Sequence, residues 1–244
     1  MSKDSLGDRM KTQYEDRFRT LLPRRVYTIL RLDGRAFHTY ARRAERPFDA
    51  RLMHSLNLTG LALAREVMGM EFGYLQSDEL SFLLTDFHTI HTEAWFDGNV
   101  QKIVSVAASI ATAAFARSPF AQEHGPATFD ARVFCLADPV EVTNYFIWRQ
   151  KDWERNSLQM LARAHFSHKA LHGKKRADLH DMLHEKGINW TQCTEEQKEG
   201  RLLVRDAAGR GIILPAPMFT GEAGRTSLGL LIPPLTSAPA SEEA

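Results

Sequence analysis

The sequence predicts an α/β (α+β) fold, in which a compact mixed core is followed by a helical C-terminal extension. Three observations support this class. Short apolar runs rich in β-branched residues alternate with stretches of helical period over the first ~140 residues. Their order is strand, helix, strand, strand, helix, strand, which is that of the ferredoxin-like split βαβ motif. A long stretch of helical period then begins near residue 140.

Local sequence accounts for each element. The run VYTILRL, residues 26–32, is β-branched and apolar and stops at an Asp-Gly turn sequence, as a buried strand does. Residues 48–70 carry apolar side chains at helical spacing, although Thr59 and Gly60 interrupt the middle of this stripe. Strands are expected over 26–32, 72–75, 80–84 and 129–136, and helices over 48–70, 100–116, 140–166 and 178–186.

These elements divide the chain into three regions. Residues 1–138 are expected to form the compact α/β core, because they hold the split βαβ pattern. Residues 139–232 form the helical extension, with a short late hairpin over 202–204 and 211–214. Residues 233–244 are rich in Pro, Ser and Ala and end acidic, which is typical of a disordered tail.

Composition narrows the classes of function. The 244 residues are 43% hydrophobic, and no apolar run approaches the ~20 residues of a membrane span. The charged N-terminus lacks the apolar region of a secretory signal, and Cys135 and Cys193 show no metal-ligand spacing, so a cytoplasmic location is expected. The net charge is only +1, so any contact with nucleic acid must come from local clusters. Two such clusters are visible, the arginines within residues 42–51 and the basic stretch 168–176.

Three acidic residues are expected to meet at one edge of the sheet. Asp33 ends the first strand, and Asp78 and Glu79 stand where the third strand begins, beside the first and antiparallel to it. Neighbouring carboxylates repel one another unless a cation lies between them, and oxygen ligands of this kind suit Mg²⁺. Gly34 leaves room for a metal or a phosphate near the backbone. Asp-Gly and Ser-Asp-Glu are also ordinary turn sequences, so spacing alone leaves a purely structural role open.

Several segments resemble a known family. They are RLDGRAFHTY (31–40), FGYLQSDELSFLL (72–84), FDARVF (129–134) and WRQKDWERNSLQML (148–161), with LGDRMKTQYE (6–15) and HKALHGK (168–174). Together they are similar to the tRNA-histidine guanylyltransferase superfamily, and most similar to its like-protein branch of 3′–5′ polymerases. The resemblance implies a polymerase-type palm domain. It also implies two Mg²⁺ ions held by Asp33, the Gly34 carbonyl, Asp78 and Glu79.

The same resemblance implies further binding residues. Some match family contacts only in part, as Arg46 does, where the family has a lysine. The residues expected at the nucleotide are Arg35, Ala36, Phe37, His38, Arg46, Ser77, Lys102 and Asn156. The residues expected at the tRNA are Arg132, Arg149, Gln150, Arg155, Lys169, Lys174 and Lys175. Trp148, which precedes two of them, is expected in the core.

One departure from the family pattern narrows the expected activity. Where guanylyltransferases proper have HINNLYN, this chain has Glu154-Arg155-Asn156-Ser157-Leu158-Gln159-Met160. The like-protein branch lacks the HINNLYN motif in the same way. The resemblance therefore implies templated repair of truncated 5′ ends of tRNA more than strict addition of guanylate to tRNA-histidine.

The implied reaction has two steps. The 5′-monophosphate of tRNA first attacks ATP and is adenylylated, and the 3′-hydroxyl of GTP or another nucleoside triphosphate then attacks the activated phosphate. The resemblance also implies a homotetramer built as a dimer of dimers. Three alternatives stay open: guanylate addition at position −1 of tRNA-histidine, a palm-domain enzyme of the nucleotidyl-cyclase kind, and a non-catalytic RNA-binding module.

Overall fold

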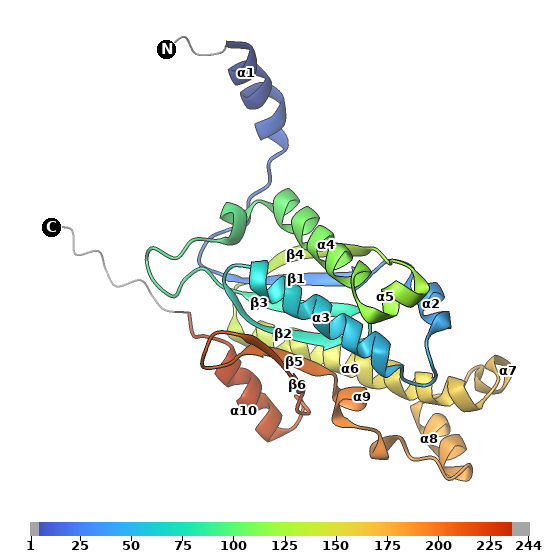
Figure 1. Ribbon diagram of the computed structural model, residues 1–244. Coiled ribbons are helices and arrows are strands. Elements are labelled where there is room, and N and C mark those ends of the chain that lie inside the picture. The colour runs from blue at the N-terminus through green and yellow to red at the C-terminus, as the bar shows by residue number, and fades with distance from the viewer. Residues whose placement is uncertain (1–4, 236–244) are drawn as a thin grey trace.

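A six-stranded antiparallel sheet forms the centre of the protein (Figure 1). The computed structural model describes residues 5–235, so most of the predicted tail, from residue 236 onward, lies outside the described residues. The strand order is β4-β1-β3-β2-β5-β6, and its first four members have the order of the ferredoxin-like motif, as predicted. The strands are β1 (Tyr27–Gly34), β2 (Met70–Gln76), β3 (Glu79–Leu84), β4 (Phe129–Leu136), β5 (Arg201–Arg205) and β6 (Gly211–Pro215).

The late hairpin widens the core sheet. Its first strand, β5, pairs with β2, and Leu75 lies opposite Arg201. The predicted hairpin is thus present, but it is part of the sheet of the core and does not belong to a separate appendage. The boundary predicted at residue 138 therefore divides the chain in sequence only, because strands from both sides of it lie in one sheet.

Two helices cover one face of the sheet (Figure 1). They are α3 (Ala50–Glu66) and α4 (Val100–Ala116), with the short α5 (Pro119–His124) beside them. The buried Asp49 caps α3 by accepting from the backbone N–H groups of Arg51 and Leu52. The helix runs unbroken through Gly60, where a Cβ would lie only 2.8 Å from Leu75 Cδ2. The glycine that interrupts the apolar stripe is thus what lets α3 approach the sheet.

The other face carries α6 (Pro139–His165), a 27-residue helix that begins at its cap Asp138. The helices α9 (Glu195–Glu199) and α10 (Glu222–Leu231) pack against it, and a second apolar cluster lies between the strands, α6 and α10. The far end of α6 extends past the sheet, where α7 (His168–Leu171) and α8 (Arg176–Glu185) pack on it around a third cluster (Figure 1). One long helix therefore connects the sheet to the end of the molecule that carries α7.

The remaining elements are short. The N-terminal segment projects from the body, and residues 6–21 are exposed (Figure 1). None of the described helices has the length and apolar character needed to cross a membrane. The short elements are α1 (Ser5–Met10), η1 (Lys11–Glu15), η2 (Asp16–Phe18), α2 (Phe37–Tyr40), η3 (Ala41–Arg43), η4 (Trp95–Gly98) and η5 (Trp190–Gln192).

Candidate active site

The predicted acidic residues lie together at one edge of the sheet. In the antiparallel pairing of β1 with β3, Leu32 lies opposite Leu80, so Asp33, the penultimate residue of β1, lies next to the start of β3 at Glu79. Asp78 lies in the turn between β2 and β3, which Ser77 closes with a left-handed φ of 45°. Topology thus brings together residues that are about 45 positions apart in sequence, as predicted.

Gly34 is required by the packing directly beneath the site. A Cβ at this position would lie 2.1 Å from Phe37 Cδ2, a distance that no side chain tolerates. Phe37 is only 5% exposed, and its ring contacts those of Tyr40, Phe115 and Phe129. The Phe37 side chain therefore belongs to the core, and the predicted contact of this residue with a nucleotide is left to its backbone.

Glu79 is held by two arginines. Arg149 of α6 donates from Nε to Oε1 at 2.7 Å and from Nη2 to Oε2 at 2.5 Å, and both side chains are 5% exposed. Arg31 Nη2 lies 2.8 Å from the same Oε2. Ser81 Oγ also donates to Oε1 at 3.3 Å. With both oxygens occupied by donors, Glu79 offers no open metal ligand in this structure, which corrects its predicted role as a third one.

Asp33 and Asp78 are the two less enclosed acids. Burial, followed by repulsion from Asp33 and Glu79, raises the pKa of Asp78 to about 6, although Ser77 Oγ donates to its Oδ1 at 2.8 Å. Burial also raises the pKa of Asp33, against the attraction of Arg31, and Glu79 adds to the increase. A divalent cation between the two carboxylates would relieve this repulsion.

The donor set suits magnesium better than a metal held by side chains alone. Within residues 5–235, no group of three His, Cys, Asp or Glu side chains is arranged to hold a metal ion. Magnesium commonly takes one or two carboxylates and completes its shell with waters and substrate phosphates. Asp33 and Asp78, beside the backbone carbonyl of Gly34, fit that pattern.

Several predicted binding residues border these acids. Arg132 of β4 is 55% exposed, and its Nη2 lies 3.9 Å from Asp33 Oδ2. Arg35 and His38 are exposed directly after β1, and Ala36 between them is exposed with a left-handed φ of 55°. Arg46 is exposed in the loop that precedes α3. The structure therefore leaves these residues accessible near the edge where β1 ends.

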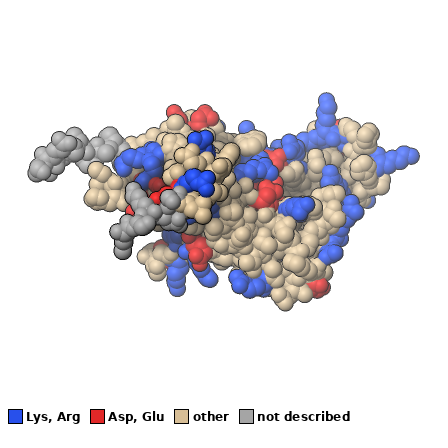
Figure 2. Space-filling model, turned by 90° about the horizontal axis from the view of Figure 1, so that it is seen from above, with Lys and Arg blue, Asp and Glu red and all other residues tan. Residues whose placement is uncertain are grey.

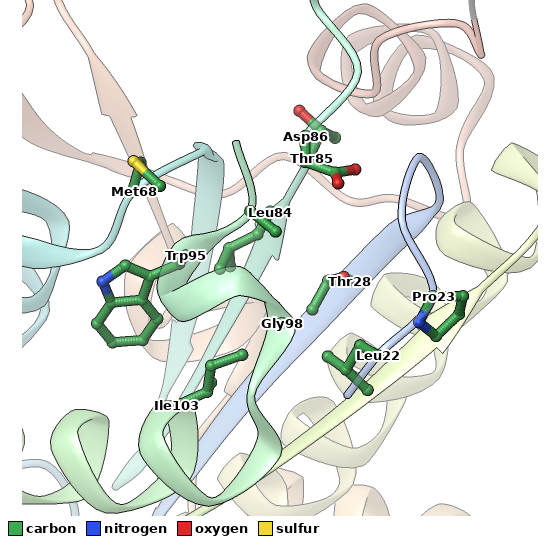
Figure 3. Close-up of a pocket in the computed structure, with 11 residues that line it drawn as sticks. Leu22, Pro23, Thr28, Met68, Leu84, Thr85, Asp86, Trp95, Gly98 and Ile103 are labelled. Atoms are coloured by element: carbon green, nitrogen blue, oxygen red, sulfur yellow. The ribbon is translucent and has the colours of Figure 1, made fainter. Parts of the chain in front are cut away.

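Lys102 lies at the wrong edge of the sheet for its predicted role. It is in the first turn of α4, beside Ile103, which shares a small pocket with Thr28 and Leu84 (Figure 3). Thr28 is opposite Leu84 near the beginning of β1, about 17 Å along the strand from Asp33 at roughly 3.4 Å per residue. In this topology the second helix starts where β3 ends, so Lys102 is remote from the acids of its own chain.

Arg149 and Gln150 are buried, and their predicted contact with tRNA is wrong. Gln150 is 0% exposed, donates to the carbonyls of Glu199 and Pro217, and accepts from the N–H of Phe219. Its amide therefore fixes the connections that follow α9 and β6. Trp148, expected in the core, is 55% exposed, and its ring lies 4.4 Å from the Arg149 guanidinium carbon.

A row of polar contacts continues along α6. Arg149 Nη2 also donates to Asp152 Oδ2 at 3.0 Å. Asp152 pairs in turn with Arg155, which is 63% exposed, and accepts from Asn156 Nδ2 at 3.4 Å. These contacts connect buried Glu79 to Arg155 and Asn156, which were predicted to contact the tRNA and the nucleotide. Lys169, Lys174 and Lys175 are exposed farther on, around α7.

Sequence reasoning missed Arg31 and Tyr145 as parts of the site. Arg31 precedes Asp33 by two residues, so strand alternation places both on the face that α6 covers. Tyr145 Oη lies 2.8 Å from Ser81 Oγ, and it precedes Arg149 by one helical turn. The two-residue period of the strand could therefore have identified Arg31 from the sequence, and the helical period could have identified Tyr145.

Comparison with known proteins assigns the family. The sequence model of the tRNAHis guanylyltransferase family matches residues 7–137, more than half of the chain. The chain belongs to the tRNAHis guanylyltransferase family. The predicted family and enzyme class, a nucleotidyltransferase, are thereby confirmed.

Relatives match most of the length of this family member. An uncharacterized protein of Acanthamoeba polyphaga mimivirus is 27% identical over 227 residues, which cover 82% of this chain and 77% of that protein. The tRNA(His) guanylyltransferase of Schizosaccharomyces pombe is 28% identical over 211 residues, or 80% of this chain and 78% of that enzyme.

Solved structures of the tRNAHis guanylyltransferase family share this fold. A bacterial tRNA(His) guanylyltransferase (Thg1)-like protein in complex with ATP superposes with a TM-score of 0.86 at 39% identity, over 93% of this chain and 99% of that one. A bacterial protein of the same description in complex with GTP gives a TM-score of 0.78 at 35% identity, over 94% and 99%. The enzyme of Saccharomyces cerevisiae, at 20% identity, a TM-score of 0.68 and coverages of 84% and 96%, shares the fold.

Proposed function

We propose that this protein repairs truncated 5′ ends of tRNA by template-dependent 3′–5′ nucleotide addition. The observation that carries the proposal is the pair Asp33 and Asp78 at the edge of a palm-like sheet, with Glu79 fixed behind them by Arg149. Two carboxylates at such an edge suit nucleotidyl transfer, in which negative charge gathers on phosphate oxygens. The bacterial relatives in complex with ATP and GTP support nucleoside triphosphates as the second substrate.

Asp33, Asp78 and the Gly34 carbonyl would hold two Mg²⁺ ions together with substrate phosphates. Bound there, the metal would supply charge neutralisation for the phosphates and would favour the deprotonated form of the attacking hydroxyl. The protein supplies the frame, because Arg149 and Arg31 hold Glu79 and Arg31 reaches to 3.8 Å from Asp33 Oδ2. Arg132, at the rim of the site, is placed to bind a phosphate oxygen.

The reaction proceeds in two displacements at this one site. A phosphate oxygen at the RNA 5′ end attacks the α-phosphorus of ATP, forming a 5′–5′ phosphoanhydride and releasing pyrophosphate. The 3′-hydroxyl of the incoming nucleotide then attacks the 5′ phosphorus of the RNA and releases AMP. Both steps bring phosphate groups to Arg132 and to the cations that Asp33 and Asp78 would hold, so one arrangement of residues serves both.

The segment 154–157 supports repair over guanylate addition at position −1. Glu154, where the guanylyltransferases proper have a histidine, pairs with Arg176 at 3.5 Å. Ser157 is buried, donates to the Gln197 carbonyl at 2.6 Å, and accepts from Trp190 Nε1 at 3.0 Å. These side chains join α6 to α8 and α9, so their polar groups are used within the protein. This use of the segment fits an enzyme that selects nucleotides by pairing with a template.

An extension assay tests the proposal. A tRNA that lacks its first nucleotide and carries a 5′-monophosphate is incubated with ATP, Mg²⁺ and each nucleoside triphosphate in turn. We expect addition of the nucleotide complementary to the opposing base, and a changed product when that base is changed. Intact tRNA-histidine serves as the second substrate, and preferential addition of guanylate to it would favour the alternative activity.

Matched variants link the result to the site. Asp78→Ala should abolish addition, whereas Arg210→Ala, which removes an exposed surface arginine, should leave addition intact. The proposal is overturned if the wild-type protein adds nothing to either tRNA, or if Asp78→Ala retains activity. The homotetramer implied by the family resemblance remains a prediction, which light scattering in solution would test.

A further inference from the structure

Two glutamates that the proposed reaction does not use lie where α6 meets α8 and α9 (Figure 1). Ser157 of α6 donates to the Gln197 carbonyl at 2.6 Å, and Gln150, two turns earlier, donates to the Glu199 carbonyl at 3.1 Å. These two bonds hold α9 along one stripe of α6. Glu154 lies on the same stripe, between Gln150 and Ser157, so it faces the end of α9.

Glu199 is buried at this junction with one carboxyl oxygen unused. The residue is 6% exposed, and its Oε2 has no hydrogen-bond partner among residues 5–235. Its backbone cannot move outward easily, because its carbonyl accepts from Tyr74 Oη at 2.8 Å as well as from Gln150. Burying an ionised carboxylate without a partner is costly, so this position favours a protonated Glu199.

The charges around Glu199 do not balance its own. The titratable and charged groups that face it are Glu154 from α6, Arg176 from α8, Tyr74 from β2, and Lys198 and Glu195 from its own helix. Arg176 Nη1 lies 3.5 Å from Glu154 Oε2, so this guanidinium is already engaged by the other acid. Burial, followed by repulsion from Glu154, raises the pKa of Glu199 to about 7, against the attraction of Lys198 and Arg176.

The direction of this shift is opposite to the one that the nearby surface would cause. Figure 2 shows Lys and Arg side chains along the right-hand end of the molecule, which in Figure 1 is the end that carries α7. Arg176 begins α8 only a few residues after α7, so it belongs to this basic end. Cations favour the ionised form of a neighbouring acid. Burial and Glu154 therefore outweigh the basic surroundings at Glu199.

The acidic pair is connected to the packing of α8. The guanidinium carbon of Arg176 lies 5.9 Å from the ring centre of Trp190, which is 7% exposed and donates from Nε1 to Ser157 Oγ at 3.0 Å. Trp190 packs with Leu179 and Leu183 of α8 in the third apolar cluster, which also includes residues of α6. A charge gained at Glu199 therefore acts on the contacts that hold α8 and α9 against α6.

We propose that this junction is a proton-controlled clamp, in which Glu199 carries a proton beside the Glu154 carboxylate while α8 and α9 are packed on α6, and in which loss of that proton opens the junction locally. No substrate or metal takes part in the clamp, which is therefore independent of the proposed function. The closed state is fully favoured below the ordinary pKa of a glutamate, 4.5, and loses this advantage as the pH rises to about 7. One linked proton makes the opening equilibrium increase about tenfold per pH unit in this range.

His180 is a second group near the junction that titrates near neutral pH. Its ring centre lies 5.9 Å from that of Trp190, and burial, followed by the positive charge of Arg176, lowers its pKa. A histidine with a lowered pKa destabilises the closed state as the pH falls, whereas Glu199 destabilises it as the pH rises. The sign of the pH dependence therefore distinguishes the two residues.

Hydrogen–deuterium exchange of the whole chain tests the clamp. Exchange would be followed in residues 176–200 and, for comparison, in residues 100–116 of α4 from pH 4 to pH 8, with correction for the intrinsic rate at each pH. In wild type, the opening of residues 176–200 should increase about tenfold per pH unit between about pH 4.5 and 7 and then level off. Residues 100–116 should not follow this increase. Glu199→Gln should keep residues 176–200 closed over the whole range.

Three further variants separate the possible causes. Glu195→Gln, at an exposed position of α9, and His180→Gln should both show the wild-type increase. Glu154→Gln removes the repulsion, so the increase should level off at a lower pH. Circular dichroism would confirm that each variant is folded. A wild-type protein without the increase overturns the clamp, and so does the same increase in Glu199→Gln. A parallel increase in residues 100–116 also overturns it, because the whole protein would then be unfolding.

Discussion

Arg149 and Glu79 form a buried two-point ion pair between α6 and the first residue of β3. Each side chain is 5% exposed, and Arg31 completes the neutralisation of the carboxylate from β1. The pair therefore joins the long helix to the strand that follows the Asp78 turn. Its contribution is to position the acidic edge, since both Glu79 oxygens are used within the protein.

Removing one member of this pair should be more damaging than removing both. Arg149→Met leaves a buried carboxylate with Arg31 as its remaining cation, and we expect a loss of about 3 kcal/mol in the free energy of unfolding. Arg149→Met/Glu79→Met should recover most of that loss while activity stays low. Urea denaturation of the four members of the cycle measures this, and additive losses would contradict the coupling.

Magnesium binding should depend on Asp33 and Asp78 and be retained without the Glu79 charge. In the presence of ATP, Mg²⁺ should raise the melting temperature of wild type and of Glu79→Gln, because a ligand that binds the folded state stabilises it. Asp33→Asn and Asp78→Asn should lose the increase. A Glu79→Gln variant that is folded but unresponsive to Mg²⁺ would show that this carboxylate is a ligand after all.

Gly34→Ala should destabilise the core beneath the site. The added Cβ would meet Phe37 at 2.1 Å, and relief requires movement of a ring packed against three others. We expect a loss of about 1–3 kcal/mol, as in other overpacked cores, and partial recovery in Gly34→Ala/Phe37→Leu. Gly229→Ala is the control, because its Cβ would meet nothing in α10 and should not destabilise the protein. Equal effects of the two substitutions would refute the steric argument.

Glu199→Gln should stabilise the protein increasingly as the pH rises above about 4.5, and most above about 7. Glu199 is 6% exposed, and burial followed by repulsion from Glu154 raises its pKa to about 7. The folded state thus holds a proton that the unfolded state releases near pH 4.5, so the contribution of Glu199 to stability is full below pH 4.5, decreases as the pH rises from there, and is lost above about pH 7.

Melting temperatures at pH 4 and pH 8 would measure this effect. Glu199→Gln should match wild type at pH 4, below the unfolded value of 4.5, and exceed it at pH 8. Glu195→Gln, at an exposed position of the same helix, should follow wild type at both values. Identical pH profiles for Glu199→Gln and wild type would contradict the raised pKa.

Much of this arrangement was predictable because it depends on period and topology. The run 100–116 and the run 129–136 were delimited as α4 and β4 have them, since apolar patterning defines buried elements. The meeting of Asp33 with Asp78 followed from the strand order alone. The family resemblance supplied the chemistry, which spacing had left open.

Two of the errors concerned polar residues that have buried partners, and a third concerned Lys102. Arg149 and Gln150 were taken for surface contacts because of their polarity, yet they lie on the same helical stripe as Val142, Phe146 and Trp153. Sequence alone does not reveal that a carboxylate from β3 would neutralise Arg149. The position of Lys102 could have been predicted from the sequence. The topology that brings the acids together also places the start of the second helix at the edge of the sheet opposite to the acids.

The pairing of β5 with β2 has a consequence for synthesis of the chain on the ribosome. Strand β2 is complete at Gln76, but the strand that covers its outer edge begins at Arg201. At roughly 5–20 residues per second, that edge stays without its partner for about 6–25 s as the chain grows. An uncovered strand edge is a template for pairing with other chains. Chaperone binding to nascent chains should therefore be strongest before the final hairpin emerges.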